Sequence, residues 1–439
     1  MKNKIIVVTL LAAVVSAPAL AQTPATPKNV EVVIDGVAGF QDTPMQPDGK
    51  WHVHDPARPQ PPVVTPGTFS ENATPPNDAI ILFDGKDLSQ WRDKDGKPAP
   101  WKIEDGVMVS AKSDIVSKKE FGDLQLHLEF REPVPGRGDG QGRGNSGVFF
   151  MGQYEVQVLD CYINKTYADG ATGGLYGQHP ALAQTPATPK NVEVVIDGVA
   201  GFQDTPMQPD GKWHVHDPAR PQPPVVTPGT FSENAKPPAD AIVLFDGKDV
   251  SEWTDKQGNP APWKVEDGVM VSAKSDIVSK KKFGDLQLHL EFREPTPGRG
   301  DGQGRGNSGV FFMGQYEIQV LDCYENKTYA DGATAGLYGQ HPPLANVCRP
   351  PGEWQTYDFV FNVPHFGLNG EVLSPAYITV IQNGVVVQNH QAYRGATNWK
   401  SPGKYTPHGP TGPIALQYHN NSVSFRNIWV RPVPLVNEP

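Results

Sequence analysis

The chain has 439 residues and a formal net charge of −10, a length that accommodates two or three ordinary domains. Its acidic balance argues against a nucleic-acid-binding protein, whose surface would be basic, and no polybasic run suits an anionic membrane surface. Glycine and proline number 45 each, well above ordinary usage, which favours many short strands joined by turns.

The first residues are typical of a secretory signal. Lys2 and Lys4 supply the positive start, and residues 5–15 form an apolar run that is too short to span a bilayer. Small residues at Ala19 and Ala21 predict cleavage after Ala21. We therefore expect an exported protein, periplasmic or extracellular, that is not held at a membrane once the signal is removed. A retained anchor helix is the alternative.

A long internal duplication follows the signal. Residues 19–73 recur unchanged as residues 181–235, and residues 74–180 recur with scattered changes as residues 236–342. After residue 342 the second copy continues to the C-terminus, whereas the first copy breaks off at residue 180. Recombination at a shared short tract explains this pattern, and an error in joining sequence fragments would produce the same text.

The duplication predicts a domain organisation with one incomplete and one complete unit. We expect a first copy with open sheet edges that is inactive and folds poorly alone. The single ending should complete the second copy, because completing the first would loop out the second at a cost of roughly 4–5 kcal/mol. The expected segments are a signal (1–21), a Pro-rich extended segment (22–77), a truncated first copy (78–180), a repeated Pro-rich linker (181–239) and a complete domain (240–434).

Two motifs for metals or cofactors are weak in their context. "WHVHD" places His214 and His216 on one side of an extended segment, but no carboxylate run is nearby and the segment reads as linker. The glycine-rich loop "PGRGDGQGRG" has no helix opening after it, so the dinucleotide interpretation fails. We expect neither a metal nor a cofactor.

The second copy reads as a series of short strands from Asp240 onward. "AIVLFDGKDVSEW" and "WKVEDGVMVS" combine apolar runs with DG turns, and "DLQLHLEFR" (285–293) alternates strictly. Further strands are expected at "NSGVFF", "YEIQVLD", "TYDFVFNV", "AYITVIQNGVVVQ", "PIALQYH" and "VSFRNIWVRP". Without a convincing helical stretch, this pattern predicts an all-β sandwich or jelly roll of two antiparallel sheets.

The polar faces of these strands carry the candidate site. If the strands neighbour one another, one sheet face gathers carboxylates, amides, an imidazole and guanidinium groups, which together suit a polyhydroxylated ligand such as a sugar. The alternative is a solvated outer face with cross-strand ion pairs. The residues concerned are Glu291, Arg293, Asn307, Glu317, Gln319, Gln417, His419 and Arg426.

An ordinary retaining glycosidase is disfavoured. That mechanism needs two carboxylates about 5–5.5 Å apart, and β-sandwich glucanases often place them two residues apart on one strand. Here that spacing yields Glu317 and Gln319, an acid and an amide. An acid from another strand, such as Glu291, is the open alternative.

The cysteines agree with the duplication. Cys161 and Cys323 occupy equivalent positions, and Cys348 lies beyond the break and has no counterpart in the first copy. In an oxidising compartment we expect Cys323 to pair with Cys348. This closes a loop of about 25 residues, worth roughly 3–4 kcal/mol in the chain-entropy model.

Nine motifs in order resemble the 3-keto-disaccharide hydrolase family, also described as 3-keto-glucoside 1,2-lyase and 3-keto-2-hydroxy-glucal hydratase. The resemblance covers about residues 240–432, and its first half recurs at 78–180. It implies a concanavalin A-like sandwich, preceded here by a truncated tandem copy. The motifs are "LFDGKDVSEW", "WKVEDGVM", "FGDLQLHLEFR", "GNSGVFF", "YEIQVLD", "GLYG", "PPGEWQTY", "GPIALQYH" and "VSFRNIWVRP".

The implied chemistry is elimination from a 3-keto-glycoside followed by hydration, which needs one base, donors for an enolate and one acid. We expect Glu317 as the base and His419 as the proton donor. Arg293, Asn307 and Gln319 are expected to orient the sugar or hold the enolate. The rival hypotheses are a carbohydrate-binding module without catalysis and a structural envelope protein.

Overall fold

The computed structural model describes residues 30–46, 50–58, 73–111, 113–162, 164, 170–176, 192–196, 199–205, 219, 233–367, 369–399 and 401–433. The predicted signal (1–21) and the pair His214 and His216 lie outside the described residues. In the described part, no helix is long and apolar enough to cross a membrane.

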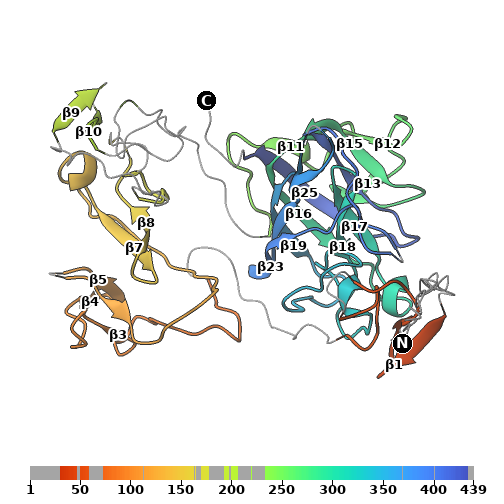
Figure 1. The fold of residues 1–439 in the computed structure, drawn as a ribbon, viewed down its shortest axis with the longest axis horizontal. Helices are drawn as coiled ribbons and strands as arrows, with labels where there is room; N and C mark the ends of the chain where they lie inside the picture. The colour runs from red at the N-terminus through yellow and green to blue at the C-terminus, as the bar shows by residue number, and fades with distance from the viewer. Residues whose placement is uncertain are drawn as a thin grey trace, which may run out of the picture.

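The second copy and the C-terminal ending form one all-β sandwich of two antiparallel sheets (Figure 1). The larger sheet has eight strands in the order β13-β14-β25-β16-β19-β22-β23, and β11 also pairs with β25. Its strands are β11 (Ile242–Phe245), β13 (Lys264–Glu266), β14 (Val269–Val271), β16 (Leu286–Arg293), β19 (Gln355–Asn362), β22 (Tyr377–Gln382), β23 (Val385–Ala392) and β25 (Ser424–Pro432).

The smaller sheet has five strands in the order β12-β15-β24-β17-β18. These are β12 (Trp253–Asp255), β15 (Ile277–Phe283), β17 (Ser308–Phe312), β18 (Tyr316–Val320) and β24 (Gly412–Leu416). Inward-facing side chains of the two sheets make the core, in which the Phe312 and Phe361 rings stack with centroids 4.7 Å apart. Residues that alternate with these core positions therefore face outward, on opposite sides of the sandwich.

The ending completes the second copy by supplying the inner strands of both sheets. β16 pairs with β19 on one side and with β25 on the other. In the smaller sheet, β24 lies between β15 and β17. The described strand pairs of the ending are thus all made with the second copy or within the ending itself.

The first copy shows what the same sequence does without the ending. Its described strands form two-stranded pairings, β3 (Trp91–Arg92) with β6 (Val116–Ser117), β4 (Lys102–Glu104) with β5 (Val107–Val109), and β7 (Ser146–Phe150) with β8 (Tyr154–Val158). "LQLHLEFRE" at residues 124–132 is identical to the stretch that begins β16, yet it forms no strand. Leu126 is 41% exposed, whereas its counterpart Leu288 is fully buried. The segment has lost both neighbouring strands, so its alternating pattern has no sheet to join.

The Pro-rich segment before the first copy packs against the sandwich of the second copy. It contains the hairpin β1 (Glu31–Ile34) and β2 (Val37–Phe40), and its identical counterpart forms β9 (Glu193–Ile196) and β10 (Val199–Phe202). Figure 1 shows the red N-terminal hairpin beside the sandwich, away from the first copy. We call residues 30–46 and 50–58 the N-terminal strap.

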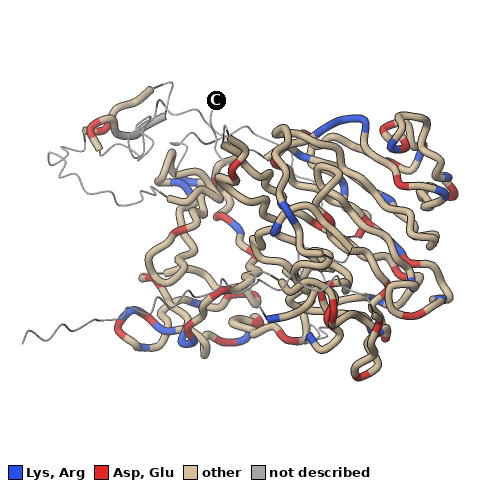
Figure 2. The backbone as a smooth tube through the Cα atoms, turned by 45° about the vertical axis from the view of Figure 1, so that its right-hand side comes forward, with Lys and Arg blue, Asp and Glu red and all other residues tan. Residues whose placement is uncertain are grey.

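Acidic and basic residues are interspersed over the described backbone, with no extended basic stretch in that part of the chain (Figure 2). Cys323 and Cys348 are close: burial and the neighbouring Cys323 thiol raise the pKa of Cys348 well above its ordinary value. Both are free thiols in this structure, so their pairing remains a prediction.

We expect oxidation to join Cys323 to Cys348 and to stabilise the sandwich by roughly 3 kcal/mol, because the closed loop restricts the unfolded chain. Peptide mapping under non-reducing conditions identifies the cross-link, and urea unfolding with and without reductant measures the gain. A link from Cys161 to either thiol, or equal stability in both conditions, would contradict this expectation.

Candidate active site

The predicted site residues divide between the two outer faces of the sandwich. Glu317 and Gln319 alternate with the core residues of β18, so they face outward from the smaller sheet. Glu291 and Arg293 alternate with the core residues of β16 and face outward from the larger sheet. The expectation of one shared face is therefore wrong, because packed sheets lie about 10 Å apart with their outer faces turned away from each other. Local alternation cannot show which sheet a strand joins.

The cluster on the larger sheet is a closed network of ion pairs. Glu291 accepts hydrogen bonds from Arg426 Nε at 2.7 Å and Asn427 Nδ2 at 2.9 Å. Burial alone would raise the pKa of Glu291, but the hydrogen bonds from His289, Asn427 and Arg426 outweigh it and hold this pKa low. His289 also contacts Asp358, with Nδ1 2.7 Å from Oδ1.

This network matches the cross-strand ion-pair alternative. Burial lowers the pKa of His289, but Asp358 and Glu291 outweigh it and raise the pKa to about 9, so the imidazole is charged and paired at neutral pH. The guanidinium groups of Arg293 and Arg426 lie 4.6 Å and 3.9 Å from the Trp354 ring. Arg293, Glu291 and Arg426 are therefore occupied in stabilising this face and are separated from Glu317 by the core.

Glu317 on the smaller sheet has a different environment. Its side chain is 4% exposed, and no described residue donates a hydrogen bond to its carboxylate. Burial, with a smaller contribution from Asp276, raises the pKa of Glu317 to about 8. Its backbone is fixed on both sides: Thr397 Oγ1 accepts from the Glu317 N–H at 3.0 Å, and the Tyr393 hydroxyl donates to the Glu317 carbonyl at 3.3 Å. A buried carboxylate without donors is a stronger base than one in water.

Amide side chains lie next to Glu317 on the same face. Gln319 Nε2 donates to Gln303 Oε1 at 2.8 Å, and Asn307 Nδ2 donates to the Gln303 carbonyl at 2.8 Å. Thr328 Oγ1 accepts from Gln303 Nε2 at 2.7 Å. The Gln319 Oε1 atom is buried without a hydrogen-bond partner in the described part. Asn307 and Gln319 thus share a partner, Gln303, on a face that presents amide donors and acceptors.

Two tyrosines, Tyr329 and Tyr338, border this face. Their hydroxyls are 2.8 Å apart. Burial raises the pKa of both, and the charge of Glu317 contributes in each case. The phenols therefore lie within electrostatic reach of the Glu317 carboxylate and remain protonated hydrogen-bond donors at neutral pH.

The remaining predicted residues lie further along the strands. Gln417 N donates to Gly309 O at 3.0 Å, and Gly309 is in register with Gln319, so Gln417 follows the same face. His419 is exposed beyond the end of β24, four residues after Ala415. Ala415 is in register with Phe311, which pairs with Glu317. Four residues of strand span roughly 13 Å, so the structure does not bring His419 to Glu317.

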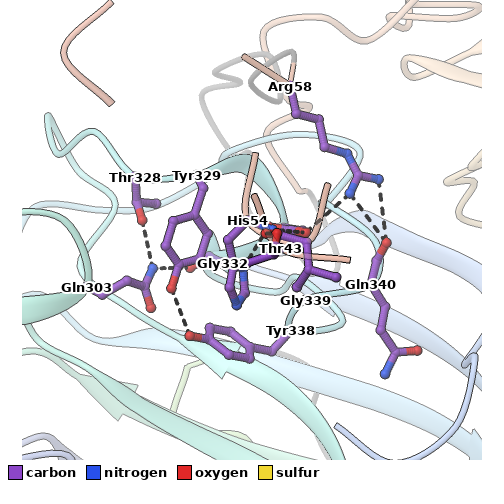
Figure 3. A network of polar contacts seen from close by, with 12 residues as sticks. Thr43, His54, Arg58, Gln303, Thr328, Tyr329, Gly332, Tyr338, Gly339 and Gln340 are labelled. Carbon is purple, nitrogen blue, oxygen red and sulfur yellow. Dashed lines mark hydrogen bonds and ion pairs between the residues drawn. The ribbon is translucent and has the colours of Figure 1, made fainter. Parts of the chain in front are cut away.

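A buried histidine next to this face, which sequence reasoning missed, comes from the N-terminal strap. His54 is fully buried, and its ring lies 4.0 Å from the Tyr329 ring and 4.8 Å from the Tyr338 ring, centroid to centroid (Figure 3). The "WHVHD" motif was the available signal. Its second occurrence, with His214 and His216, reads as linker, whereas the identical first occurrence packs on the sandwich. Among the described residues, no group of three metal-binding side chains is present.

The chain matches one family model, described as the 3-keto-alpha-glucoside-1,2-lyase-like domain. The match covers residues 78–217 and 240–431. The chain belongs to this family. A proposed glycosyl hydrolase from Parabacteroides distasonis is 47% identical over 52% of this chain and 100% of its own, with a TM-score of 0.48. No curated protein matches the chain.

More distant structures share only the fold. A second proposed glycosyl hydrolase from Parabacteroides distasonis is 22% identical, covering 44% of this chain and 94% of its own, with a TM-score of 0.34. A lichenase from a mouse hindgut metagenome is 12% identical, covering 44% and 99%, with a TM-score of 0.26. The chain is therefore a carbohydrate-active, glycosyl hydrolase-like protein, in which a truncated tandem copy precedes a concanavalin A-like sandwich of two antiparallel sheets.

Within this family assignment, the two copies are not equivalent. The first copy keeps Glu155, Gln157 and Asn145 in the positions of Glu317, Gln319 and Asn307. Glu155 is only half-buried, and its pKa is raised by burial and by Asp114. Without the ending, the first copy has no equivalent of β24 or of the loop that holds Thr397. The complete candidate site is therefore in the second copy.

Proposed function

We propose that the protein cleaves 3-keto-glycosides by eliminating the aglycone and then hydrating the product. The observation that carries this proposal is Glu317, a buried carboxyl with a pKa of about 8 that receives no hydrogen bond from any described residue, on a face lined by amides and phenols. Family membership supports the same substrate class. Elimination requires a single base and no carboxylate nucleophile, which fits a face where the second carboxylate position is Gln319.

The reaction balances with this residue set. The ketone at C3 acidifies the hydrogen on C2, and the Glu317 carboxylate removes it as a proton. The electron pair forms an enolate, which the N–H groups of Gln319 and Asn307 stabilise once they turn toward it from Gln303, their acceptor in this structure. Collapse of the enolate restores the C3 carbonyl, forms the C1–C2 double bond and expels the glycosidic oxygen, which takes a proton to leave as an alcohol. Water then adds to C1 while C2 regains a proton.

Incubation with a p-nitrophenyl 3-keto-glucoside tests the proposal. We expect release of nitrophenol, and in D₂O we expect deuterium at C2 of the 3-keto-glucose product. A carbohydrate-binding module on the same fold would bind the compound without release, and a structural envelope protein would do neither. Stable nitrophenyl 3-keto-glucoside in the presence of intact protein would rule out the proposed activity.

We also propose that the protein acts after export, on the evidence of residues 1–21. Intact-mass measurement of the protein from the periplasm or medium tests this, because removal of residues 1–21 changes the mass by a known amount. A full-length mass in an exported fraction, or retention in the cytoplasm, would contradict it.

The pH dependence of the rate follows from the raised pKa of Glu317. The base must be ionised, and with a pKa of about 8 only about a tenth of the enzyme is active at pH 7. On the p-nitrophenyl 3-keto-glucoside, whose leaving group needs no acid, we expect kcat/KM to rise close to tenfold per pH unit below pH 7 and to level off above pH 8. Initial rates from pH 5 to 9 measure this profile. A profile that is flat above pH 5 would show that the base has an ordinary carboxyl pKa.

A further inference from the structure

The N-terminal strap is anchored on the sandwich by specific polar contacts. Gln46 Nε2 donates to Gly339 O at 2.5 Å, and Lys327 Nζ donates to Asp35 O at 2.9 Å. Arg58 Nη1 lies 3.4 Å from both Asp331 Oδ2 and Gln340 O. Val53 and His54 are wholly buried by this packing. The strap therefore forms part of the folded site, although its sequence resembles a linker.

The backbone of the strap holds His54 in an unusual conformation. His54 has φ +62°, in the left-handed region that few non-glycine residues adopt. Its carbonyl accepts from Phe40 N at 2.9 Å. Gly39 permits this approach, because a Cβ there would lie 2.4 Å from the His54 carbonyl oxygen. The hairpin β1–β2 thus fixes the direction of the ring.

The two ring nitrogens of His54 have different environments. Nδ1 lies 3.1 Å from Oδ1 of the buried Asp331, and the His54 backbone N–H donates to Oδ2 at 3.2 Å. Asp331 is fully buried; burial alone would raise its pKa, but His54 and Arg58 outweigh it and lower the pKa. The carboxylate therefore orients the ring and favours a proton on Nδ1.

The Nε2 atom of His54 is buried and has no hydrogen-bond partner in the described part of the protein. A merely structural buried histidine would satisfy both nitrogens, because an unpaired buried polar atom costs roughly 1–3 kcal/mol. This ring contacts Tyr329 and Tyr338, the two phenols that are in electrostatic reach of Glu317. The imidazole ring therefore packs against the two phenols that border the Glu317 face.

We propose that His54 Nε2 is the proton-transfer partner of Glu317, supplied to the sandwich by the N-terminal strap. This inference rests on the elimination reaction proposed above. The His54 imidazolium, stabilised by Asp331, gives its Nε2 proton to the departing glycosidic oxygen while the Glu317 carboxylate takes the C2 proton. In hydration, neutral Nε2 takes a proton from the water that adds to C1, and Glu317 returns its proton to C2. Both groups end in their starting states.

The duplication supplies a second candidate for the same position. Residues 192–220 are identical to residues 30–58, so His216 corresponds to His54. In the structure, the first segment is the one that packs on the sandwich. Because the identical second segment could replace it, a test must remove both histidines. It also offers a matched control, because His52 and its counterpart His214 lie two residues away in the same motif. The His52 Nδ1 atom contacts the Thr43 carbonyl within the strap.

The experiment compares three full-length proteins: wild type, the H54A/H216A variant and the H52A/H214A control. Each is assayed on two 3-keto-glucosides, one with p-nitrophenol and one with an alkyl alcohol as the leaving group. For H54A/H216A we expect kcat on the alkyl substrate to fall by at least ~10²-fold. We expect a much smaller loss on the nitrophenyl substrate, which leaves without an acid. Added imidazole should restore part of the alkyl rate, and H52A/H214A should keep wild-type kcat on both.

The outcomes separate this inference from the proposed function. Wild-type kcat on the alkyl substrate in H54A/H216A, or equal losses on both substrates without rescue by imidazole, would overturn the role of His54. A loss in H216A alone but not in H54A alone would overturn the assignment to the N-terminal strap.

If wild type releases no aglycone at all, the proposed function fails. The contact between His54 and the sugar is then tested by a binding measurement. The imidazole NMR signals of His54, assigned by their absence in the single variant H54A, should then shift when a 3-keto-glucoside is added. Unshifted signals in the presence of bound sugar would overturn the contact.

Discussion

Replacing Glu317 by glutamine should abolish turnover while leaving the sandwich folded and more stable at neutral pH. The amide matches the carboxyl in shape but cannot accept a proton, so we expect kcat on the nitrophenyl 3-keto-glucoside to fall by at least ~10³-fold, near the upper range for general bases. Adding Q319E to the wild-type protein is not a useful control, since it places a second buried acid beside Glu317. The variant E155Q in the first copy is the matched control and should keep wild-type activity.

The stability gain of E317Q follows from the linkage between protonation and folding. Since burial raises the pKa of Glu317 from 4.5 to about 8, the folded protein holds a proton that the unfolded chain releases. The stability contributed by this site is present below about pH 4.5 and is lost as the pH rises to about 8. By pH 7 the loss in the free energy of unfolding is at most roughly 3 kcal/mol. We expect E317Q to gain roughly 1–3 kcal/mol at pH 8 and much less at pH 5.

Urea unfolding of wild type and E317Q at pH 5 and pH 8 measures this difference. The other buried carboxyl with a raised pKa, Glu294, is present in both proteins, so its contribution cancels in the comparison. A wild type that is more stable than E317Q at pH 8 would show that the carboxylate is well solvated. Full activity in E317Q would remove Glu317 from the mechanism.

The strands of the complete copy could be predicted from the sequence, because the alternation of apolar and polar residues that marks each strand lies within the strand itself. Strict alternation identifies β16, and the run "YEIQV" identifies β18 with its outward Glu317 and Gln319. Which sheet each strand joins depends on pairings between distant segments, such as Glu291 with Arg426. Alternation therefore places Glu291 and Glu317 equally well, and only the topology separates a paired structural carboxylate from an unpaired one.

The contribution of the strap could not be predicted for a different reason. Residues 30–58 have little hydrophobic periodicity, and their buried contacts are single side chains inserted into the sandwich, such as Val53 and His54. No pattern in the strap specifies Asp331 or Gly339 as its partners. Within the strap, the two histidines of "WHVHD" were the feature of the sequence that pointed to chemistry. The contacts of His54 with Asp331 and Tyr329 arise only when the chain folds.

Ending the chain after Pro342 should remove cooperative folding from the second copy. This truncation deletes β19, β22, β23 and β25 from the larger sheet and β24 from the centre of the smaller one. Leu286, Leu288, Leu290 and Phe292 would lose the neighbours that bury them, and each such burial stabilises by about 1.5–3 kcal/mol. The summed loss of roughly 6–12 kcal/mol equals the whole stability of an ordinary domain.

The first copy already displays the outcome, because Leu124, Leu126, Leu128 and Phe130 are 41–51% exposed in the same sequence without an ending. We expect the truncated chain to show no sigmoidal thermal transition by circular dichroism and to be cut by protease throughout residues 240–342. Deleting residues 78–180 instead, which spares the strap and the sandwich, should leave the main transition of the full chain unchanged. A cooperative transition in the chain ending at Pro342 would mean that the front half folds without β24 and β25, and the inactivity expected of the first copy would then need another cause.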